Sequence, residues 1–383
     1  MMPGYKKTEI GLIREEWEVA QIRDVCELVN GRGFKPFEWE KVGLPIVRIQ
    51  NLNGSTDFNF YSGQYNPKIH IQNGQLLFAW SGSRGTSFGP HIWNGGSALL
   101  NYHTWKVVVN ESVVTPDFLL FSLRQLTRFI EDKAHGASAL VHTQKWEMEK
   151  FPIIFPGNLT EQRAIATALS DIDALLNSLD CLIAKKRDFK QAAMQQLLTG
   201  QTRLPGFSGE WEIKRLGDVV EIKKGQLITS STLQQGDIPV VAGGKQPAYF
   251  HSSANRVGRT VTISASGASA GYVALYNEPI FASDCSTIGE SDDYCLDFVF
   301  FQLLNAQQTI YKAQTGGAQP HIHAKDLNPI LFAFPPKSEQ TAIANVLTKM
   351  DAELVALEQR RNKTAVLKQG MMQELLTGRT RLV

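Results

Sequence analysis

The sequence predicts an α+β protein in which two mixed α/β domains are separated by two long helices that form an antiparallel coiled coil. Three observations predict this fold. The chain is written twice, each copy ends in a long stretch with coiled-coil spacing, and each copy begins with short strand-like runs. At 383 residues the chain is long enough for two domains with separate cores. A two-part unit fused twice gives an internal pseudo-two-fold repeat.

Two sets of matching residues show the duplication. Residues 16–19 (EWEV) recur as residues 210–213 (EWEI), and Gly31 meets Gly225 at the same shift of 194. Residues 161–204 match residues 339–382 at a shift of 178, with 22 identities in 44 positions. The order along the chain is therefore domain, helix, domain, helix. The boundaries we expect are 1–157 and 205–336 for the domains, and 158–204 and 337–383 for the helical segments.

Apolar residues in both helical segments alternate steps of four and three, which is typical of a coiled-coil seam. The seam residues are Ile165, Leu169, Ile172, Leu176, Leu179 and Ile183 in the first copy, and Ile343, Leu347, Met350, Leu354 and Leu357 in the second. The repeat makes each helix the natural partner of the other, although packing of each helix on its own domain stays open. Thr160 and Ser338 are candidate N-caps, and Gly200 and Gly378 stand where the helices would end.

Short apolar or alternating runs predict strands at residues 44–49, 75–80, 105–109 and 260–264. One helix per domain is expected, beginning near Thr115 and near Leu296. The four cysteines are scattered and fit no disulfide framework, which favours a reducing, cytoplasmic location. No apolar run is long enough to span a bilayer. The net charge of +2 means that any affinity for DNA must come from local patches or from partners.

Several segments resemble the specificity subunit of type I restriction–modification enzymes. Residues 200–211 (GQTRLPGFSGEW) resemble the junction between the family's central helix and its second domain, and residues 335–340 (PPKSEQ) the entry to its conserved helix. Residues 78–83 and 263–268 resemble the strand-and-loop segments of the two target-recognition domains, and residues 7–11 the family's usual opening. Arg14 stands where the family pattern has proline. The resemblance covers essentially the whole chain.

This resemblance implies a non-catalytic subunit that binds double-stranded DNA through its two target-recognition domains. Each domain would read one half-site of a bipartite target. Between Gly31 and Phe155, and between Gly225 and Phe334, the two copies share little beyond scattered residues, so we expect the half-sites to differ and the target to be asymmetric. The resemblance also implies docking of two methyltransferase subunits on the helices, so that adenines in the target are methylated, and of motor-nuclease subunits for restriction of unmethylated DNA. The methyl donor, ATP and magnesium would then be held by these partners, and this chain would need no cofactor.

The residues also argue independently against an active site in this chain. A glycine-rich phosphate loop ending in Lys-Ser/Thr is absent, as are a methyl-donor loop and an Asn-Pro-Pro-aromatic motif. Asp117 and Glu131 imitate a nuclease's carboxylates, but on one helix they would lie about 21 Å apart, too far to share a metal ion. Capping is the better interpretation of Asp117. A metal site made by His321 and His323 with two of the cysteines lacks tight spacing.

Base-edge donors and acceptors read sequence, whereas phosphate contacts only position a protein on DNA. The candidate DNA-binding residues are Arg48, Gln50, Asn51, Asn53, Ser81, Ser83 and Arg84 in the first domain, and Lys245, Gln246, Tyr249, Asn255, Arg256, Ser264, Ser266 and Ser269 in the second. Gly82 and Gly85 would allow close approach of the backbone. For any single residue, a solvated polar loop is an equal alternative. His142 and His323 each precede a lysine, which suggests a shared polar loop.

Basic clusters recur on the helices at residues 185–190 and 360–368. They are candidates for contact with the DNA spacer or with the methyltransferase, and a solvated helix face is the alternative. Two other classes of function remain as rivals: a self-sufficient methyltransferase–nuclease, and a coiled-coil scaffold that binds only protein.

Overall fold

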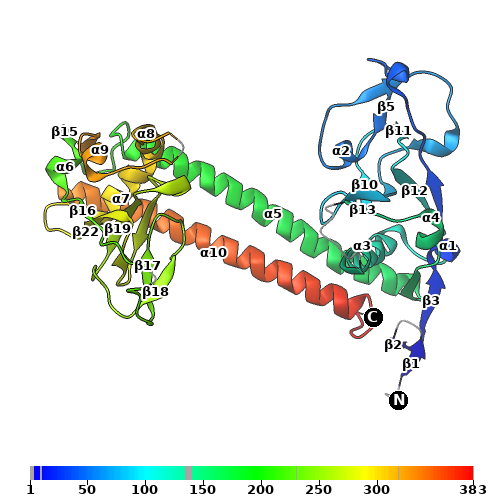
Figure 1. The fold of residues 1–383 in the computed structure, drawn as a ribbon. Helices are drawn as coiled ribbons and strands as arrows, with labels where there is room; N and C mark the ends of the chain where they lie inside the picture. The colour runs from blue at the N-terminus through cyan, green and yellow to red at the C-terminus, as the bar shows by residue number, and fades with distance from the viewer. Residues whose placement is uncertain (1–3, 9–10, 134–139, 230, 318, 383) are drawn as a thin grey trace. The chain divides into compact units, whose positions relative to one another are not determined.

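The computed structural model describes residues 4–8, 11–133, 140–229, 231–317 and 319–382. It divides into two compact units, which we call unit 1 (residues 1–178 and 361–383) and unit 2 (residues 179–360) (Figure 1). Each unit holds one mixed α/β domain and about half of each long helix. The predicted fold class, two α/β domains with two long helices that pack together, is therefore confirmed.

Unit 1 contains two four-stranded sheets. One has the order β10-β8-β12-β4 with antiparallel neighbours, and the other has the order β6-β5-β11-β7, in which β5 and β11 run parallel. The strands of these sheets are β4 (Cys26–Asn30), β5 (Leu44–Val47), β6 (Asn59–Tyr61), β7 (His70–Ile71), β8 (Gln75–Ala79), β10 (Gly89–Trp93), β11 (Ala98–Leu100) and β12 (Thr104–Val109).

Smaller elements complete unit 1. The two-stranded pairs are β1 (Tyr5–Thr8) with β2 (Gly11–Arg14), β3 (Trp17–Gln21) with β14 (Pro152–Pro156), and β9 (Ser81–Ser83) with β13 (Leu140–His142). The helices are α1 (Ile22–Val25), α2 (Ile49–Leu52), α3 (Pro116–Lys133) and α4 (Lys145–Met148), with 3-10 turns η1 (Pro36–Glu38) and η2 (Pro67–Ile69).

Unit 2 repeats this framework with fewer strands. A four-stranded antiparallel sheet has the order β16-β22-β19-β20, and a three-stranded sheet has the order β18-β17-β21 with β17 and β21 parallel. The strands are β15 (Glu212–Arg215), β16 (Lys223–Lys224), β17 (Ile238–Val241), β18 (Tyr249–His251), β19 (Thr260–Ser264), β20 (Val273–Tyr276), β21 (Phe281–Ala282), β22 (Cys285–Gly289) and β23 (Leu331–Phe334), and β15 pairs with β23. The helices are α6 (Leu216–Val219), α7 (Leu296–Asn305), α8 (Gln307–Lys312) and α9 (Ala324–Leu327), with the 3-10 turn η3 (Gly267–Ser269).

The predicted strands and domain helices appear where the sequence places them. Strand β8 is apolar from Leu76 to Ala79 and buried along that run, and β19 is buried at all five positions. Such continuous burial fits a strand covered on both faces. Helices α3 and α7 begin at Pro116 and Leu296, each one residue beyond a backbone amide that is held by a buried glutamine.

The long helices are α5 (Leu159–Leu197) and α10 (Lys337–Leu375). Their predicted N-caps, Thr160 and Ser338, are both wrong by two residues. Helix α5 begins at Leu159, and Asn158 is the cap because its side-chain oxygen accepts a hydrogen bond from Thr160 N at 2.8 Å. Helix α10 begins before Ser338, directly after Pro336. The predicted ends hold, because Gly200 and Gly378 follow with φ angles of 71° and 69°.

In each unit the start of one long helix packs beside the end of the other. In unit 1, Ile165 and Leu169 share a buried cluster with Met372 and Leu375, and this cluster continues into the domain core. In unit 2, Ile343 and Leu347 share a cluster with residues 194–198. This pairing of starts with ends makes the helices antiparallel. The helices therefore contact both their own domains and each other, so the two packing alternatives occur together.

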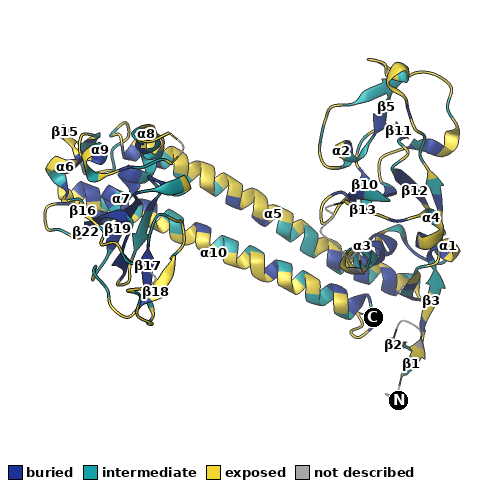
Figure 2. Ribbon diagram, in the orientation of Figure 1, coloured by how far each residue is buried: buried dark blue, intermediate teal, exposed yellow. Residues whose placement is uncertain are grey.

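The remaining seam positions are buried to different degrees, and Figure 2 shows how buried, intermediate and exposed residues alternate along both long helices. Leu179, Ile183 and Leu354 are buried, whereas Ile172, Leu176, Met350 and Leu357 are half-buried.

A repeated corner explains why particular residues recur in the sequence. In unit 1, Arg381 donates two hydrogen bonds to the buried Glu161, at 2.9 and 2.8 Å. In unit 2, Arg203 does the same to Glu339, at 2.6 Å for both. The Glu339 carboxylate raises the pKa of Arg203 above its usual value, and Glu161 does the same for Arg381, mainly through these hydrogen bonds. Each pair ties a helix start to the segment that follows the other helix.

Candidate nucleic-acid interface

Four chain segments meet at the carboxyl ends of the parallel strands β5 and β11 in unit 1. Asn101 N, after β11, donates to Val47 O at 3.1 Å, and Trp80 N donates to His103 O at 3.2 Å. Strand β9 then pairs with β13, which places His142 opposite Ser81. We call this surface edge 1, made of residues 48–53, 80–84, 101–103 and 140–142.

Unit 2 builds the same surface with the same hydrogen bonds. Ser283 N donates to Val241 O at 2.7 Å, and Ala265 N donates to Asp284 O at 3.0 Å. Ser266 forms a bridge with His321. We call this surface edge 2, made of residues 242–246, 265–269, 283–284 and 320–321.

The matching hydrogen bonds align the two edges, with one residue fewer in edge 2 between the partners of Asn101 and His103, so that Tyr102 has no counterpart. Trp80 of edge 1 corresponds to Ala265 of edge 2, and His103 corresponds to Asp284. The counterpart of His142 is His321, because both pair with the segment that follows the central strand. The sequence comparison paired His142 with His323 instead. That pairing is wrong, because the hydrogen bonds between strands set which histidines correspond. Lys145 and Lys325, which suggested the pairing, lie in the short helices α4 and α9.

Of the predicted DNA-binding residues in and beside α2, one holds the loop together through hydrogen bonds inside the domain, and two are exposed to solvent. Asn51 is buried, accepts from Arg48 N, and donates to Ser55 O and Asp57 O, so its amide holds the loop together. The Arg48 guanidinium lies 5.3 Å from the centre of the Trp39 ring, a cation–π contact. Gln50 and Asn53 are exposed.

Ser83, the last residue of β9, and Arg84, which follows it, are both exposed, and Ser81 is half-buried on β9. A Cβ atom on Gly82 would lie 2.6 Å from Ser87 Oγ and 2.8 Å from Phe88 N. Gly85 has a φ of 71°, and its amide donates to Glu131 Oε1 at 2.8 Å. At Gly82 the backbone therefore approaches the chain itself closely, whereas Gly85 is favoured by its positive φ, and approach of either glycine to DNA stays a prediction.

In unit 2 three of the predicted residues use their polar atoms inside the domain. Ser264 is buried and donates to Gly243 O at 2.8 Å. Asn255 pairs both amide atoms with the backbone of Ala282. Arg256 donates to Thr287 Oγ1, to Asn255 O and to Lys224 O at 2.8–2.9 Å. These bonds hold sheet edges and loops in place.

The other predicted residues of unit 2 are accessible. Lys245 and Gln246 are exposed on edge 2, and Ser266 and Ser269 lie half-buried beside them. The Lys245 ammonium lies 5.5 Å from the centre of the Tyr272 ring. Tyr249 is half exposed on β18.

Sequence reasoning missed a row of aromatic rings that leads from the core of unit 1 to edge 1. Ring centres are 5.8 Å apart for Phe78 and Trp105 and 6.1 Å for Trp105 and Trp80, both stacked, and 5.4 Å for Trp80 and His103, which meet edge to face. Tyr102, 46% exposed, ends this row. Burial lowers the pKa of His103, which favours the neutral ring at pH 7. Aligning the sequence of the β11–β12 segment with that of the β21–β22 segment could have drawn attention to these residues.

Acidic residues of the opposite helix neutralise much of the charge in the helical basic clusters. In unit 2, Lys186 pairs with Glu353, Arg187 with Glu358 and Lys190 with Asp351, at 2.5–2.7 Å. In unit 1, Lys368 pairs with Asp173 at 2.5 Å. The Lys190 and Lys368 pairs are equivalent at the shift of 178. From the sequence we expected these clusters to contact DNA or the methyltransferase, or to form a solvated helix face. Ion pairs between the two helices were not among these expectations.

Three further features bear on chemistry. Asp117 and Glu131 both lie on α3, and Asp117 is an exposed residue of its first turn, which is compatible with the capping interpretation. Among the described residues, His, Cys, Asp and Glu form no group of three or more that could hold a metal ion. Within that same part of the chain, no helix is long and apolar enough to cross a membrane.

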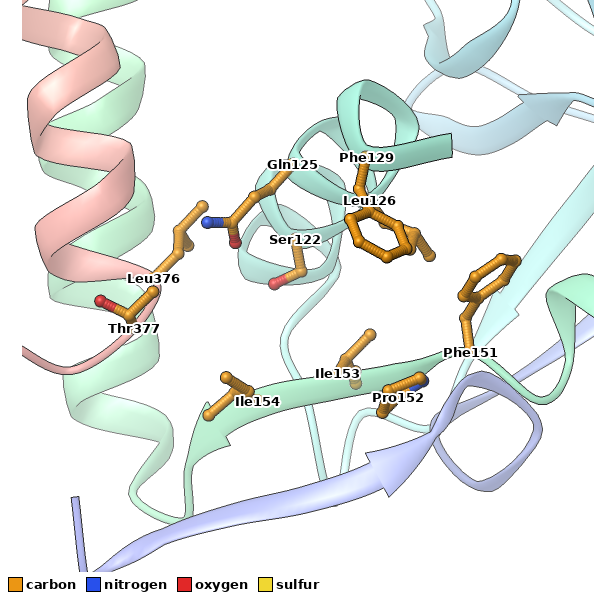
Figure 3. Close-up of a pocket in the computed structure, with 10 residues that line it drawn as sticks. All are labelled: Ser122, Gln125, Leu126, Phe129, Phe151, Pro152, Ile153, Ile154, Leu376 and Thr377. Atoms are coloured by element: carbon orange, nitrogen blue, oxygen red, sulfur yellow. The ribbon is translucent and has the colours of Figure 1, made fainter. Parts of the chain in front are cut away.

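A pocket of about 620 Å³ opens in unit 1 beside α3 (Figure 3). Its walls are mainly apolar, with Ser122, Gln125 and Thr377 as the polar side chains. Ser122 and Gln125 come from α3, and Ile153 and Ile154 from β14. None of the described residues that line the pocket has an ionisable side chain.

Comparison with known proteins agrees with this architecture. The sequence matches the family described as "Type I restriction modification DNA specificity domain" over residues 14–181 and again over residues 208–367. A putative type I restriction enzyme MjaX specificity subunit from Methanocaldococcus jannaschii is 26% identical, with 99% of this chain and 97% of the relative aligned. The MjaVIII specificity subunit of the same organism is 23% identical, over 97% and 94% of the two chains.

A solved structure shows a similar fold. The S subunit of a type I restriction–modification system from M. genitalium superposes with a TM-score of 0.66, at 18% identity, over 98% of this chain and 99% of that one. Two repeated α/β domains with polar loop edges thus define a DNA target-recognition protein. The chain belongs to the family of type I restriction–modification specificity subunits.

Proposed function

We propose that the chain reads a bipartite, asymmetric DNA target, with one half-site at edge 1 and the other at edge 2. One observation carries the proposal: the two units share a strand framework and its hydrogen bonds, but present different side chains on it. Edge 1 carries Trp80, Tyr102 and His103, whereas edge 2 carries Ala265 and Asp284 at the matching places. Different donors and acceptors select different bases, so the two half-sites differ in sequence.

We further propose that the chain performs no chemistry, and that the methyl donor, ATP and magnesium are held by partner subunits. In this role the chain binds DNA while methyltransferase subunits methylate adenines in the target, or motor-nuclease subunits cut unmethylated DNA. Of the two carboxylates that imitate those of a nuclease, Glu131 accepts a hydrogen bond from the Gly85 amide, and Asp117 lies in the first turn of α3.

Two methyltransferase subunits are proposed to dock on the long helices, one on each repeat. Phe189 on α5 and Leu367 on α10 are equivalent at the shift of 178, and each is 56% exposed. Beside Phe189 lies a hollow of about 400 Å³ lined by Ala192, Ala193 and Met350, among others. Large apolar side chains exposed at repeated places suit one kind of partner that binds twice.

Methylation of a randomised duplex library tests the proposal and its rivals together. The full chain is expressed with and without type I methyltransferase subunits, and methylated adenines are mapped by sequencing. We expect methylation only with the partner, at a target of two different half-sites separated by an unread gap. Methylation by the chain alone would support the self-sufficient enzyme. Partner binding without any sequence selection would support the scaffold, and a perfectly palindromic target would contradict the asymmetric reading.

A further inference from the structure

We propose that Asp284 is a specificity-determining residue of edge 2, whose carboxylate accepts a hydrogen bond from the exocyclic amino group of a cytosine in the second half-site. This inference rests on the proposed function and assigns one base contact within it. Asp284 lies between β21 and β22, at the centre of the segments that form edge 2.

Two neighbouring segments fix the carboxylate in place. The backbone carbonyl of Asp284 accepts from Ala265 N at 3.0 Å, and its Oδ2 accepts from Ser266 Oγ. On the other side, a Cβ atom added to Gly243 would lie 3.2 Å from Asp284 Oδ2 and 2.7 Å from Ser266 O. The side chain is half-buried, so it has few alternative positions and keeps one oxygen for an outside donor.

The charge of Asp284 gives the physical argument for a base contact. Within the described residues, Asp284 forms no ion pair with any lysine, arginine or histidine. An unpaired carboxylate on a DNA-facing edge repels phosphates and weakens binding to every sequence. Lys245 on the same edge can supply a phosphate contact, but a carboxylate can only accept hydrogen bonds. In the major groove, the amino group N4 of cytosine is the donor that Asp and Glu recognise.

Edge 1 places a different group at the matching position. His103 corresponds to Asp284, and its ring packs against Trp80 and Tyr102. A neutral imidazole carries one donor and one acceptor, whereas the carboxylate carries acceptors only. His103 and Asp284, which occupy matching positions, would therefore recognise different hydrogen-bonding groups in the two half-sites.

The test replaces the carboxylate with its amide, Asp284→Asn, which has the same shape and can still accept from Ser266. The full chain, in complex with methyltransferase subunits, is offered a randomised duplex library, and the selected sequences are read. We expect preference for cytosine at one position of the second half-site to fall on the order of tenfold, with adenine gaining because asparagine pairs with N6 and N7. Affinity for random DNA should stay equal or rise, because one negative charge is removed.

The first half-site is the internal control, and Asp292→Asn is the matched control because Asp292 is an exposed carboxylate between β22 and α7. An unchanged second half-site in folded D284N overturns the proposal, and so does a uniform change of affinity with unchanged preference. If D284N fails to fold by circular dichroism, Ser266→Ala releases the carboxylate and must relax the same single position. A parent complex that selects no sequence at all overturns the proposed function itself.

Discussion

The two units differ in the side chain that stands at the middle of their domain helices, and therefore in how that helix is joined to its neighbours. Helices α3 and α7 align from Phe118 with Phe298, which places Ser122 of unit 1 where unit 2 has Gln302. Gln302 is buried, and its amide donates to Leu198 O and Ala333 O, both at 3.0 Å. This amide ties the end of α5 and strand β23 to α7.

In unit 1 the shorter side chain leaves that space open. Ser122 donates within its own helix, to Phe118 O at 3.1 Å, and it lines the pocket together with Ile154 and Leu376 (Figure 3). Leu376 matches Leu198 at the shift of 178, and Ile154 matches Ala333 in the strand pairing. The two units thus share the arginine–glutamate pairs at their corners. They differ in the hydrogen bonds that join the end of a long helix to the domain helix, which Gln302 makes in unit 2 and Ser122 does not make in unit 1.

The largest expected effect tests whether the two frameworks are equivalent. Phe118 and Phe298 are fully buried at matching positions, so Phe118→Ala and Phe298→Ala should each cost about 3–5 kcal/mol of stability. Hydrogen exchange measured by mass spectrometry should show lost protection mainly in the unit that carries the change. Loss in only one of the two variants would contradict the equivalence, and Phe37→Ala, at an 82% exposed position, is the neutral control.

The second prediction contrasts two arginines, Arg84 and Arg256, that the sequence analysis predicted to bind DNA. Arg84 lies exposed on edge 1, so Arg84→Ala should weaken recognition of one position of the first half-site by about 1–3 kcal/mol if it contacts a guanine. Arg256→Ala should instead lower thermal stability, because it removes three hydrogen bonds inside unit 2. Library selection and thermal melts on both variants separate these outcomes. A relaxed second half-site in Arg256→Ala at unchanged stability would reverse our assignment.

The third prediction exchanges the residues at the pocket. Gln302→Ser should destabilise unit 2 by about 1–3 kcal/mol, because two buried carbonyls lose their donor and a hollow opens. Ser122→Gln should stabilise unit 1 by up to about 1 kcal/mol, since the longer amide can reach the matching carbonyls. Denaturant unfolding of both variants gives the values. Equal effects of the same sign would show that the pocket is not the counterpart of Gln302.

The smallest effect concerns the cysteines. Burial raises the pKa of both Cys26 and Cys285 to about 12, so almost none of their thiolate form is present at pH 8. Cys181 is exposed on α5. Maleimide labelling of the native protein should therefore modify Cys181 first, and leave Cys26 and Cys285 until the chain unfolds. Rapid labelling of Cys26 but not Cys285 would show that unit 1 opens more readily than unit 2.

The sequence by itself determined the repeat and the coiled-coil spacing. These are local or periodic signals: seam residues recur every three or four positions, and Glu161 and Glu339 stand at equal shifts from Arg203 and Arg381. The predicted strands and the starts of α3 and α7 were also local, because apolar runs and helix-start residues identify them.

Only the tertiary structure decided which polar residues are available on edges 1 and 2. Asn51, Asn255 and Arg256 look like readers in the sequence, yet all three use polar atoms inside the protein. Asn51 is held within its own loop, by Ser55 O and Asp57 O, whereas Asn255 and Arg256 bond to backbone groups 27 and 32 residues away. Asp284 gave no sequence signal, because its place is set by pairing of β19 with β22 and by the parallel pair β17 and β21. Hydrogen bonds between distant strands fix the edge, so the residues that share it cannot be found from spacing alone.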